Sequence, residues 1–133
     1  MNKKYIAGLF ALAVFSAVLF LTFQGPQETT SLSESVRTWI GYKGDSVHFR
    51  SDVHYIEYFI VGVASIVLAW TLGWRLWVGA IIACGFGLLD ETFKIFLPTR
   101  EFSGIDLIKD VIGIAVALGI LTLVKHVKDK QKQ

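Results

Sequence analysis

Four long apolar runs constrain what this chain can fold into more than any other feature of the sequence. They cover residues 5–23, 55–72, 76–97 and 105–124. A helix of about 20 apolar residues crosses the hydrocarbon core of a bilayer, and a chain in lipid must satisfy its backbone hydrogen bonds within each segment. The chain has 133 residues and is 53% hydrophobic, which is more apolar surface than a small soluble domain buries. The sequence therefore predicts an all-α integral membrane four-helix bundle, with 1–133 as a single domain.

The first run has a second interpretation, because Lys3 and Lys4 precede it like the basic region of a signal peptide. Its 19 uncharged residues exceed the apolar region of about 7–15 residues found in such peptides. No cleavage motif of the A-x-A type follows the run. We therefore expect 5–23 to be retained as the first membrane span.

Lysine and arginine are shared unequally between the two sides that four spans create. One side carries both termini and the 71–77 turn, with Lys3, Lys4, Arg75, Lys125, Lys128, Lys130 and Lys132. The other side carries Arg37, Lys43, Arg50 and Arg100. Because cytoplasmic segments are enriched in these residues, we expect a multi-pass membrane protein with both termini in the cytoplasm. The basic termini are too short and dilute to indicate a nucleic-acid partner.

The segment 24–53 is expected to form an outer loop that contains a short interfacial helix. The motif SLSE places Ser31 and Glu34 as a capping box. Apolar residues then recur on one face of 32–41, which is typical of an amphipathic helix at a membrane surface. An ordinary ordered loop is the alternative.

Small residues occur four apart in the last two spans, at Ala83 and Gly87 and at Gly113 and Ala117. Such pairs let membrane helices approach closely. They favour a compact bundle.

Ionisable residues gather near the outer ends of three spans. They are His54 and Glu57, expected in the first turn of the second span, Asp90 and Glu91 near the end of the third, and Asp106, Lys109 and Asp110 at the start of the fourth. Ionisable groups at membrane depth are costly and usually functional. We expect them to form one outward-facing polar pocket, closed by the 97–104 loop.

Three segments resemble the VanZ-like family of small integral membrane proteins: the first span ending in LTFQGPQ, DVHYIEYFIVG at 52–62 and DETFKIFLPTREFSGIDLIKDVIG at 90–113. The resemblance covers nearly the whole chain and carries over His54, Tyr58, Glu91, Pro98, Arg100, Asp106, Asp110 and Gly113. Lys94 stands where the family usually has glutamine, and Lys109 adds a base. The resemblance implies a cell-envelope protein associated with resistance to the glycopeptide antibiotic teicoplanin, and it implies no particular reaction.

The pocket is expected to bind rather than to catalyse. A membrane lipid or a lipid-tailed ligand would place its headgroup over the polar residues and its tail between helices. Arg100 suits a phosphate or carboxylate, since a guanidinium binds both in a bidentate manner, and the acids suit a cationic amine. The candidate ligand-binding residues are His54, Tyr58, Asp90, Glu91, Arg100, Asp106 and Asp110.

A membrane-embedded hydrolase or transferase acting on a lipid-linked phosphate or ester is the first alternative. Histidine can act as a general base near neutral pH, and the candidate catalytic residues are His54, Glu57 and Asp106. No cofactor is expected, although a divalent metal at Glu91, Asp106 and Asp110 fits the oxygen ligands that magnesium and calcium prefer. A purely structural charge network is the second alternative, and a homo-oligomer remains open.

Overall fold

The structure, a computed structural model, describes residues 2–23, 34–43, 46–97 and 101–133, and the side chains of all these residues except 23 and 46–51. Four long helices make up most of it: α1 (Lys3–Phe23), α3 (Ser46–Thr71), α4 (Leu76–Ile95) and α5 (Gly104–Gln131). No strand occurs among the described residues, and each of the four helices contains a stretch long and apolar enough to cross a membrane. The prediction of an all-α, four-helix membrane fold is confirmed.

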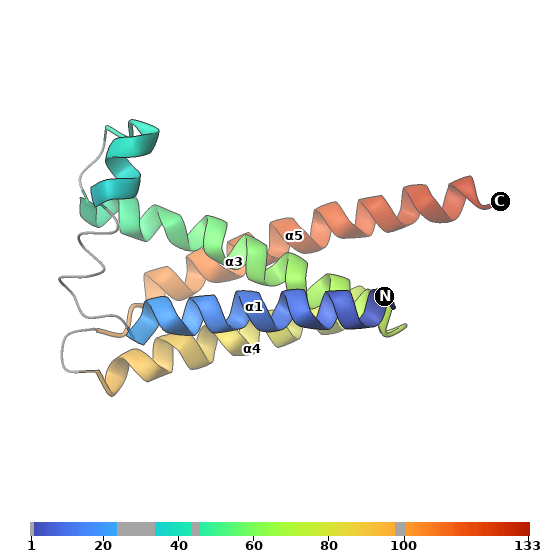
Figure 1. Ribbon diagram of the computed structural model, residues 1–133, viewed down its shortest axis with the longest axis horizontal. Helices are drawn as coiled ribbons and strands as arrows, with labels where there is room; N and C mark the ends of the chain where they lie inside the picture. The colour runs from blue at the N-terminus through green and yellow to red at the C-terminus, as the bar shows by residue number, and fades with distance from the viewer. Residues whose placement is uncertain (1, 24–33, 44–45, 98–100) are drawn as a thin grey trace.

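The four long helices run lengthwise beside one another, and successive helices run in opposite directions (Figure 1). Both chain termini lie at the same end of the bundle, which we call the terminal end. The opposite end, the distal end, holds the last turns of α1 and α4 and the first turns of α3 and α5. A short helical segment over 34–40 stands beside the start of α3 at the distal end.

Two local signals explain how the chain turns between helices. Gly73 has a φ of 81°, a conformation that glycine adopts without steric cost, and it lets the chain reverse between α3 and α4. At the start of α5, the Ser103 hydroxyl accepts a 3.2 Å hydrogen bond from the backbone N–H of Asp106. Ser103 is therefore an N-cap, as a serine before an apolar helix predicts.

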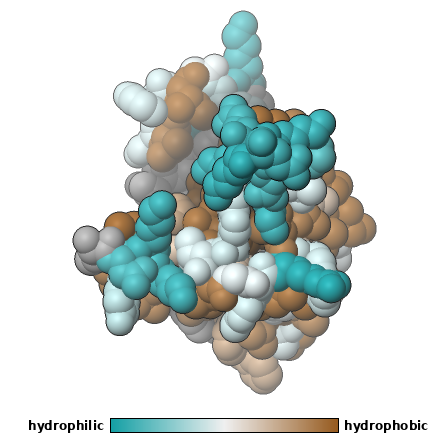
Figure 2. All heavy atoms as spheres, turned by 90° about the vertical axis from the view of Figure 1, so that its right-hand side faces the viewer, coloured by the Kyte–Doolittle hydropathy of each residue, from teal (hydrophilic) through white to brown (hydrophobic). Residues whose placement is uncertain are grey.

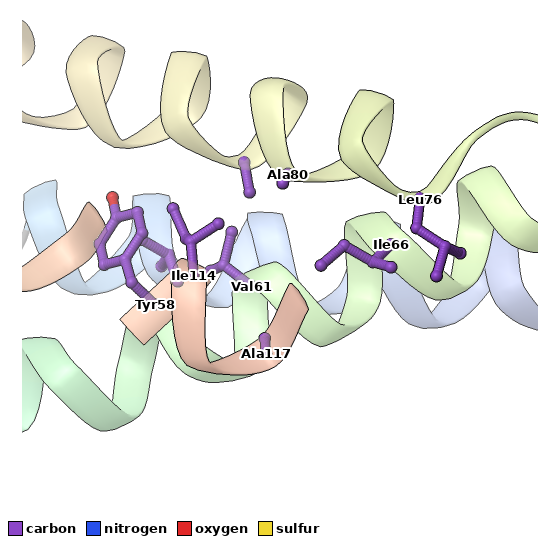
Figure 3. Close-up of a cluster of buried hydrophobic side chains, with 9 residues drawn as sticks. Tyr58, Val61, Ile66, Leu76, Ala80, Ile114 and Ala117 are labelled. Atoms are coloured by element: carbon purple, nitrogen blue, oxygen red, sulfur yellow. The ribbon is translucent and has the colours of Figure 1, made fainter. Parts of the chain in front are cut away.

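The helix α3 is the centre of the bundle and contacts α1, α4 and α5. The buried core on this helix includes Val61 and Ile66, which meet Leu76 of α4 and Ile114 of α5 (Figure 3). Tyr58 lies at one end of this apolar cluster and turns its hydroxyl toward α4. The core thus changes from aliphatic to polar at this tyrosine.

Glycines set the spacing between α3 and its neighbours. A Cβ at Gly113 would lie only 2.5 Å from the backbone oxygen of Tyr55, and one at Gly79 only 2.5 Å from Cα of Ile66. A side chain at either position would have to move backbone atoms. The expected role of small residues in helix contacts is confirmed, since Ala83, Gly87, Gly113 and Ala117 are all buried.

The outside of the bundle is largely apolar, as a lipid-facing surface requires. Exposed large side chains include Phe20 on α1, Ile81 on α4 and Ile108 on α5. Hydrophilic residues instead gather over the terminal end of the molecule (Figure 2). The surface therefore combines apolar flanks with a polar terminal end, as expected of a membrane-spanning bundle.

The structure differs from the sequence-based expectation at the start of α3. The helix begins at Ser46, so the expectation that His54 and Glu57 lie in its first turn was wrong. The stretch SVHFRSDVHY contains no proline or glycine, so nothing local interrupts the helix ahead of the apolar run. The fourth span also continues beyond its expected end, to Gln131.

The short helix expected at 32–41 is helical over 34–40. It exposes Val36, Trp39 and Ile40, the apolar residues expected on one face. The capping-box residue Ser31 lies outside the described part of the chain.

Candidate polar site at the distal end

All four long helices contribute a polar side chain to one group at the distal end, which we call the distal cluster. Its members are Thr22 of α1, His54 and Tyr58 of α3, Asp90, Glu91 and Lys94 of α4, and Asp106 and Asp110 of α5. The helices bring these residues together because α1 and α4 end where α3 and α5 begin. Most of the cluster is buried, and the exceptions, His54 and Asp106, are half-buried.

The carboxylate of Asp90 joins three helices. Its Oδ2 accepts a 2.9 Å hydrogen bond from the Tyr58 hydroxyl, and its Oδ1 accepts one from the hydroxyl of Thr22. Both donors and the acceptor are buried. A buried acid with two hydroxyl donors is held in one orientation, and here it ties α1 and α3 to α4.

The carboxylate of Glu91 is held from two sides. Lys94, one turn further along α4, forms an ion pair with its Oε1, and the backbone N–H of Ser103 donates to its Oε2 over 3.2 Å. Glu91 and Lys94 are both buried. Lys94 therefore offsets the charge of a carboxylate within the cluster.

The imidazole of His54 lies between two carboxylates of α5. Its Nδ1 is 2.9 Å from Oδ1 of Asp110, and its Nε2 is 3.8 Å from Oδ2 of Asp106. The ring lies parallel to that of Tyr58, with centroids 6.3 Å apart. The two aspartates are four residues apart on one face of α5, so the helix period itself places one at each ring nitrogen.

One oxygen of Asp110 has no hydrogen-bond partner among the described residues. This is Oδ2, which is buried and faces Gly87 of α4, where an added Cβ would lie 3.6 Å away. A buried polar atom without a partner is unfavourable and calls for a physical explanation.

A rim of polar residues surrounds the half of the cluster formed by α3 and α5. Nζ of Lys109 is 3.8 Å from Oδ1 of Asp52 and 5.4 Å from the centre of the Tyr55 ring. The Tyr42 hydroxyl, beyond the 34–40 helix, donates a 2.8 Å hydrogen bond to Oδ2 of Asp52. The rim therefore connects the segment before α3 to α5.

An apolar groove runs between α3 and α5 beside the cluster. It is lined by Tyr55, Ile56, Phe59, Ile112, Gly113 and Val116. The groove exists partly because Gly113 has no side chain. Its distal edge meets the rim, since Lys109 lies over the ring of Tyr55.

Most of the predicted site residues meet in this cluster. His54, Tyr58, Asp90, Glu91, Asp106 and Asp110 all belong to it. Arg100 lies outside the described residues, as does Pro98. Glu57 is half-buried, one turn along α3 from His54, and takes part in none of the hydrogen bonds or ion pairs found in the described part of the chain.

Two polar contacts escaped sequence reasoning. Thr22 reaches Asp90, and the backbone N–H of Ser103 reaches Glu91. A hydroxyl in the last turn of an otherwise apolar span was a usable signal for Thr22, whereas the Ser103 contact depends on the path of a loop.

The residues that could hold a metal ion also differ from the expected set. His54, Glu91 and Asp110 each offer a ligand atom, and these atoms lie within 4.8 Å of one another. Asp106, expected as a ligand, instead lies on the other side of the imidazole ring. His54 takes its place because its ring faces Asp110.

Fold and site together define a multi-pass membrane protein with a buried polar cluster at one end of its bundle. No protein-family model matches the chain, and no curated protein or solved structure does so either.

Proposed function

We propose that this protein binds a membrane amphiphile at the distal end, with the tail in the groove between α3 and α5 and the headgroup at the rim. The observation that carries this proposal is the position of the apolar groove directly beneath Lys109 and Asp52. Binding sites for small molecules combine an apolar lining with a few placed polar groups. This arrangement supplies both.

The rim suits a headgroup that carries both charges. Lys109 is a point charge of the kind that binds a lipid phosphate, and Asp52 beside it can accept hydrogen bonds from an amine. Both are present at the surface, with Lys109 half-buried and Asp52 exposed. A zwitterionic phospholipid matches this pair better than a purely anionic lipid does.

The proposed cellular setting is the bacterial cytoplasmic membrane, with both termini in the cytoplasm and the distal end facing outward. The excess of lysine and arginine at the terminal end supports this orientation. The VanZ-like motifs support a role in envelope protection, and teicoplanin, which carries a lipid tail, is the ligand they suggest. A protein that binds amphiphiles at the outer leaflet fits that role.

A photo-crosslinking experiment tests the binding proposal. The protein is placed in bilayers that contain phosphatidylethanolamine with a diazirine in its acyl chain, and adducts are located by mass spectrometry. We expect adducts to concentrate at Phe59 and Val116. The substitution Val116→Trp should remove them by filling the groove, whereas Ile120→Trp, one turn away on the exposed face of α5, should not. Adducts spread evenly over every lipid-facing helix would contradict the proposal.

The headgroup is tested with Lys109→Gln, and Lys125→Gln at the terminal end serves as the control. We expect only Lys109→Gln to lower the crosslinking yield. In a teicoplanin-susceptible bacterium, the wild-type protein should raise the inhibitory concentration of teicoplanin, and Lys109→Gln should reverse this gain. An unchanged inhibitory concentration would remove the antibiotic from the proposal and leave the phospholipid.

A hydrolase or transferase is the second candidate, because the His54–Asp110 pair has the form of an oriented general base. Asp110 bonds Nδ1 over 2.9 Å, which leaves Nε2 as the atom that would accept a proton. Incubation with radiolabelled phospholipid should then release a product with the wild-type protein and none with His54→Gln. Absence of product from the folded wild-type protein would exclude this candidate for that substrate class.

A further inference from the structure

We propose that the distal cluster binds one divalent transition-metal ion through His54, Glu91 and Asp110. The three residues come from α3, α4 and α5, and their ligand atoms lie within 4.8 Å of one another. The inference goes beyond the proposed function, because it needs no amphiphile and concerns different residues from the rim and groove.

The spacing of the closest pair already suits a shared ion. Two ligand atoms that each bind one tetrahedral zinc ion at about 2.0–2.2 Å lie about 3.3–3.6 Å apart. Nδ1 of His54 and Oδ1 of Asp110 are 2.9 Å apart. An ion beside this pair would therefore need little movement of either side chain, and Glu91 completes a three-residue set that leaves an open position.

The unpartnered oxygen of Asp110 is an independent indication of a ligand. Oδ2 is buried and makes no hydrogen bond within the described chain, and Asp110 itself is 1% exposed. It faces the side of α4 that carries Gly87, and Glu91 follows Gly87 by one helical turn on the same side. A metal ion between α4 and α5 that is bound by both oxygens of Asp110 would satisfy this one.

Charge balance points in the same direction. Asp90, Glu91 and Asp110 are buried, and Lys94 is the buried base beside them. When all four are ionised and His54 is neutral, the buried groups in the described part of the chain carry two uncompensated negative charges. Buried charges are costly unless they are paired or coordinate a metal. One divalent cation bound to neutral imidazole would bring this sum to zero.

The neighbours of the three ligands hold them as outer-shell groups do in metal sites. Glu91 is oriented by Lys94 and by the N–H of Ser103. With Nδ1 of His54 on the metal, Nε2–H would face Asp106, whose Oδ2 is 3.8 Å away. A carboxylate behind a metal-bound histidine fixes its tautomer and orientation.

The ligand types favour a transition metal over magnesium or calcium. Imidazole suits zinc, copper, iron and nickel, whereas the two hard cations prefer oxygen atoms alone. Three ligands with an open position resemble the ligand count of catalytic zinc sites. We therefore infer that zinc is the ion this site binds in the cell, and cobalt(II) serves as its spectroscopic probe.

The test uses the full chain, purified with a tag that contains no histidine and stripped with chelator in detergent free of phospholipid. Co²⁺ alone is titrated and followed by visible absorption, and Zn²⁺ is then added as competitor. We expect one equivalent of Co²⁺ to bind and to be displaced by Zn²⁺. His54→Gln and Asp110→Asn should each weaken binding by at least about tenfold. His126→Gln and Asp129→Asn, both exposed on α5, should change nothing.

Three titration results would overturn the inference. The first is that the wild-type protein, although helical and monodisperse, shows no saturable binding of Co²⁺. The second is that His54→Gln and Asp110→Asn bind Co²⁺ as well as the wild type does, and the third is that His126→Gln weakens binding. If Asp110→Asn fails to fold by circular dichroism, Glu91→Gln and His54→Gln replace it. X-ray absorption spectroscopy of the metal-loaded wild-type protein tests the site without variants. A metal coordination shell that lacks an imidazole nitrogen beside its oxygen ligands would contradict this site. Failure of the lipid crosslinking leaves all these readouts unaffected.

Discussion

The hydroxyl of Tyr58 on α3 donates a 2.9 Å hydrogen bond to Oδ2 of Asp90 on α4, with both residues buried. Tyr58 lies at one end of the aliphatic core (Figure 3), and Asp90 belongs to the distal cluster. It therefore belongs both to the packing of the bundle and to the polar site.

Removing this hydroxyl should destabilise the bundle without leaving a large cavity. Tyr58→Phe keeps the ring and deprives Asp90 of one of its two hydroxyl donors, which should lower the free energy of unfolding by about 1–3 kcal/mol. SDS-induced unfolding in mixed micelles measures the change. Tyr5→Phe on α1, where the side chain is exposed, is the control and should have no effect. Equal stability of the two variants would show that the Tyr58 bond contributes little.

The close approach of α3 and α5 should depend on Gly113. Gly113→Ala would place a Cβ 2.5 Å from the backbone oxygen of Tyr55 and 2.9 Å from the backbone nitrogen of Phe59. Backbone atoms of a helix cannot yield locally, so the helices must separate and the unfolding midpoint should fall. Gly119→Ala, on the same helix with nothing within 4 Å, should be neutral or stabilising by up to about 1 kcal/mol. If Gly113→Ala lowered the unfolding midpoint no more than Gly119→Ala does, the close packing of α3 against α5 would be contradicted.

The buried Glu91–Lys94 pair should be costly to break from one side. Lys94→Met leaves a buried carboxylate without its base and should destabilise the protein by about 3–5 kcal/mol. Combining it with Glu91→Gln removes the unpaired charge, so the double variant should recover much of the loss. Lys94→Gln, which keeps a polar side chain but removes the charge, should fall between the wild type and Lys94→Met. The half-buried pair of Arg37 and Glu34 provides the comparison, and Arg37→Met should cost less than Lys94→Met because water still reaches this pair.

The proposed orientation can be measured with single cysteines. Cys84 is the one native cysteine, and Cys84→Ala provides the background. Lys43→Cys at the distal end should react with a membrane-impermeant maleimide in intact cells, whereas Lys132→Cys should react only after lysis. The reverse pattern would place the termini outside and overturn the orientation.

The depth of the distal cluster could be predicted from the number of residues along each span. The rise of about 1.5 Å per residue sufficed to bring His54, Asp90 and Asp110 to similar depth. In the structure His54 meets Asp110, and Asp90 bonds to Tyr58, one turn from His54. The same counting did not give the start of α3, because the residues after Ser46 carry no helix breaker and the polar segment simply continues the helix.

Which side chains face one another was harder to predict than their depth. Gly113 of α5 lies against the backbone of Tyr55, and the neighbouring residue His54 faces Asp110 across the same two helices. A single sequence does not show how α3 and α5 are rotated about their own axes, since several faces of these helices are equally apolar. The expected metal ligands therefore included Asp106 where the structure offers His54.

The length of α5 has a consequence for how deeply the distal cluster is immersed in the membrane. Its 28 residues extend about 42 Å, against a hydrocarbon thickness of about 30 Å. Near its far end, Nζ of Lys128 lies 5.2 Å from the centre of the Trp70 ring, a combination suited to the headgroup level. Measured back from Lys128, Asp110 is about 27 Å away along the axis. With Lys128 and Trp70 at the headgroups of one leaflet, the carboxylate of Asp110 lies just inside the hydrocarbon boundary of the opposite leaflet. A water-borne ion or a polar headgroup can reach it there.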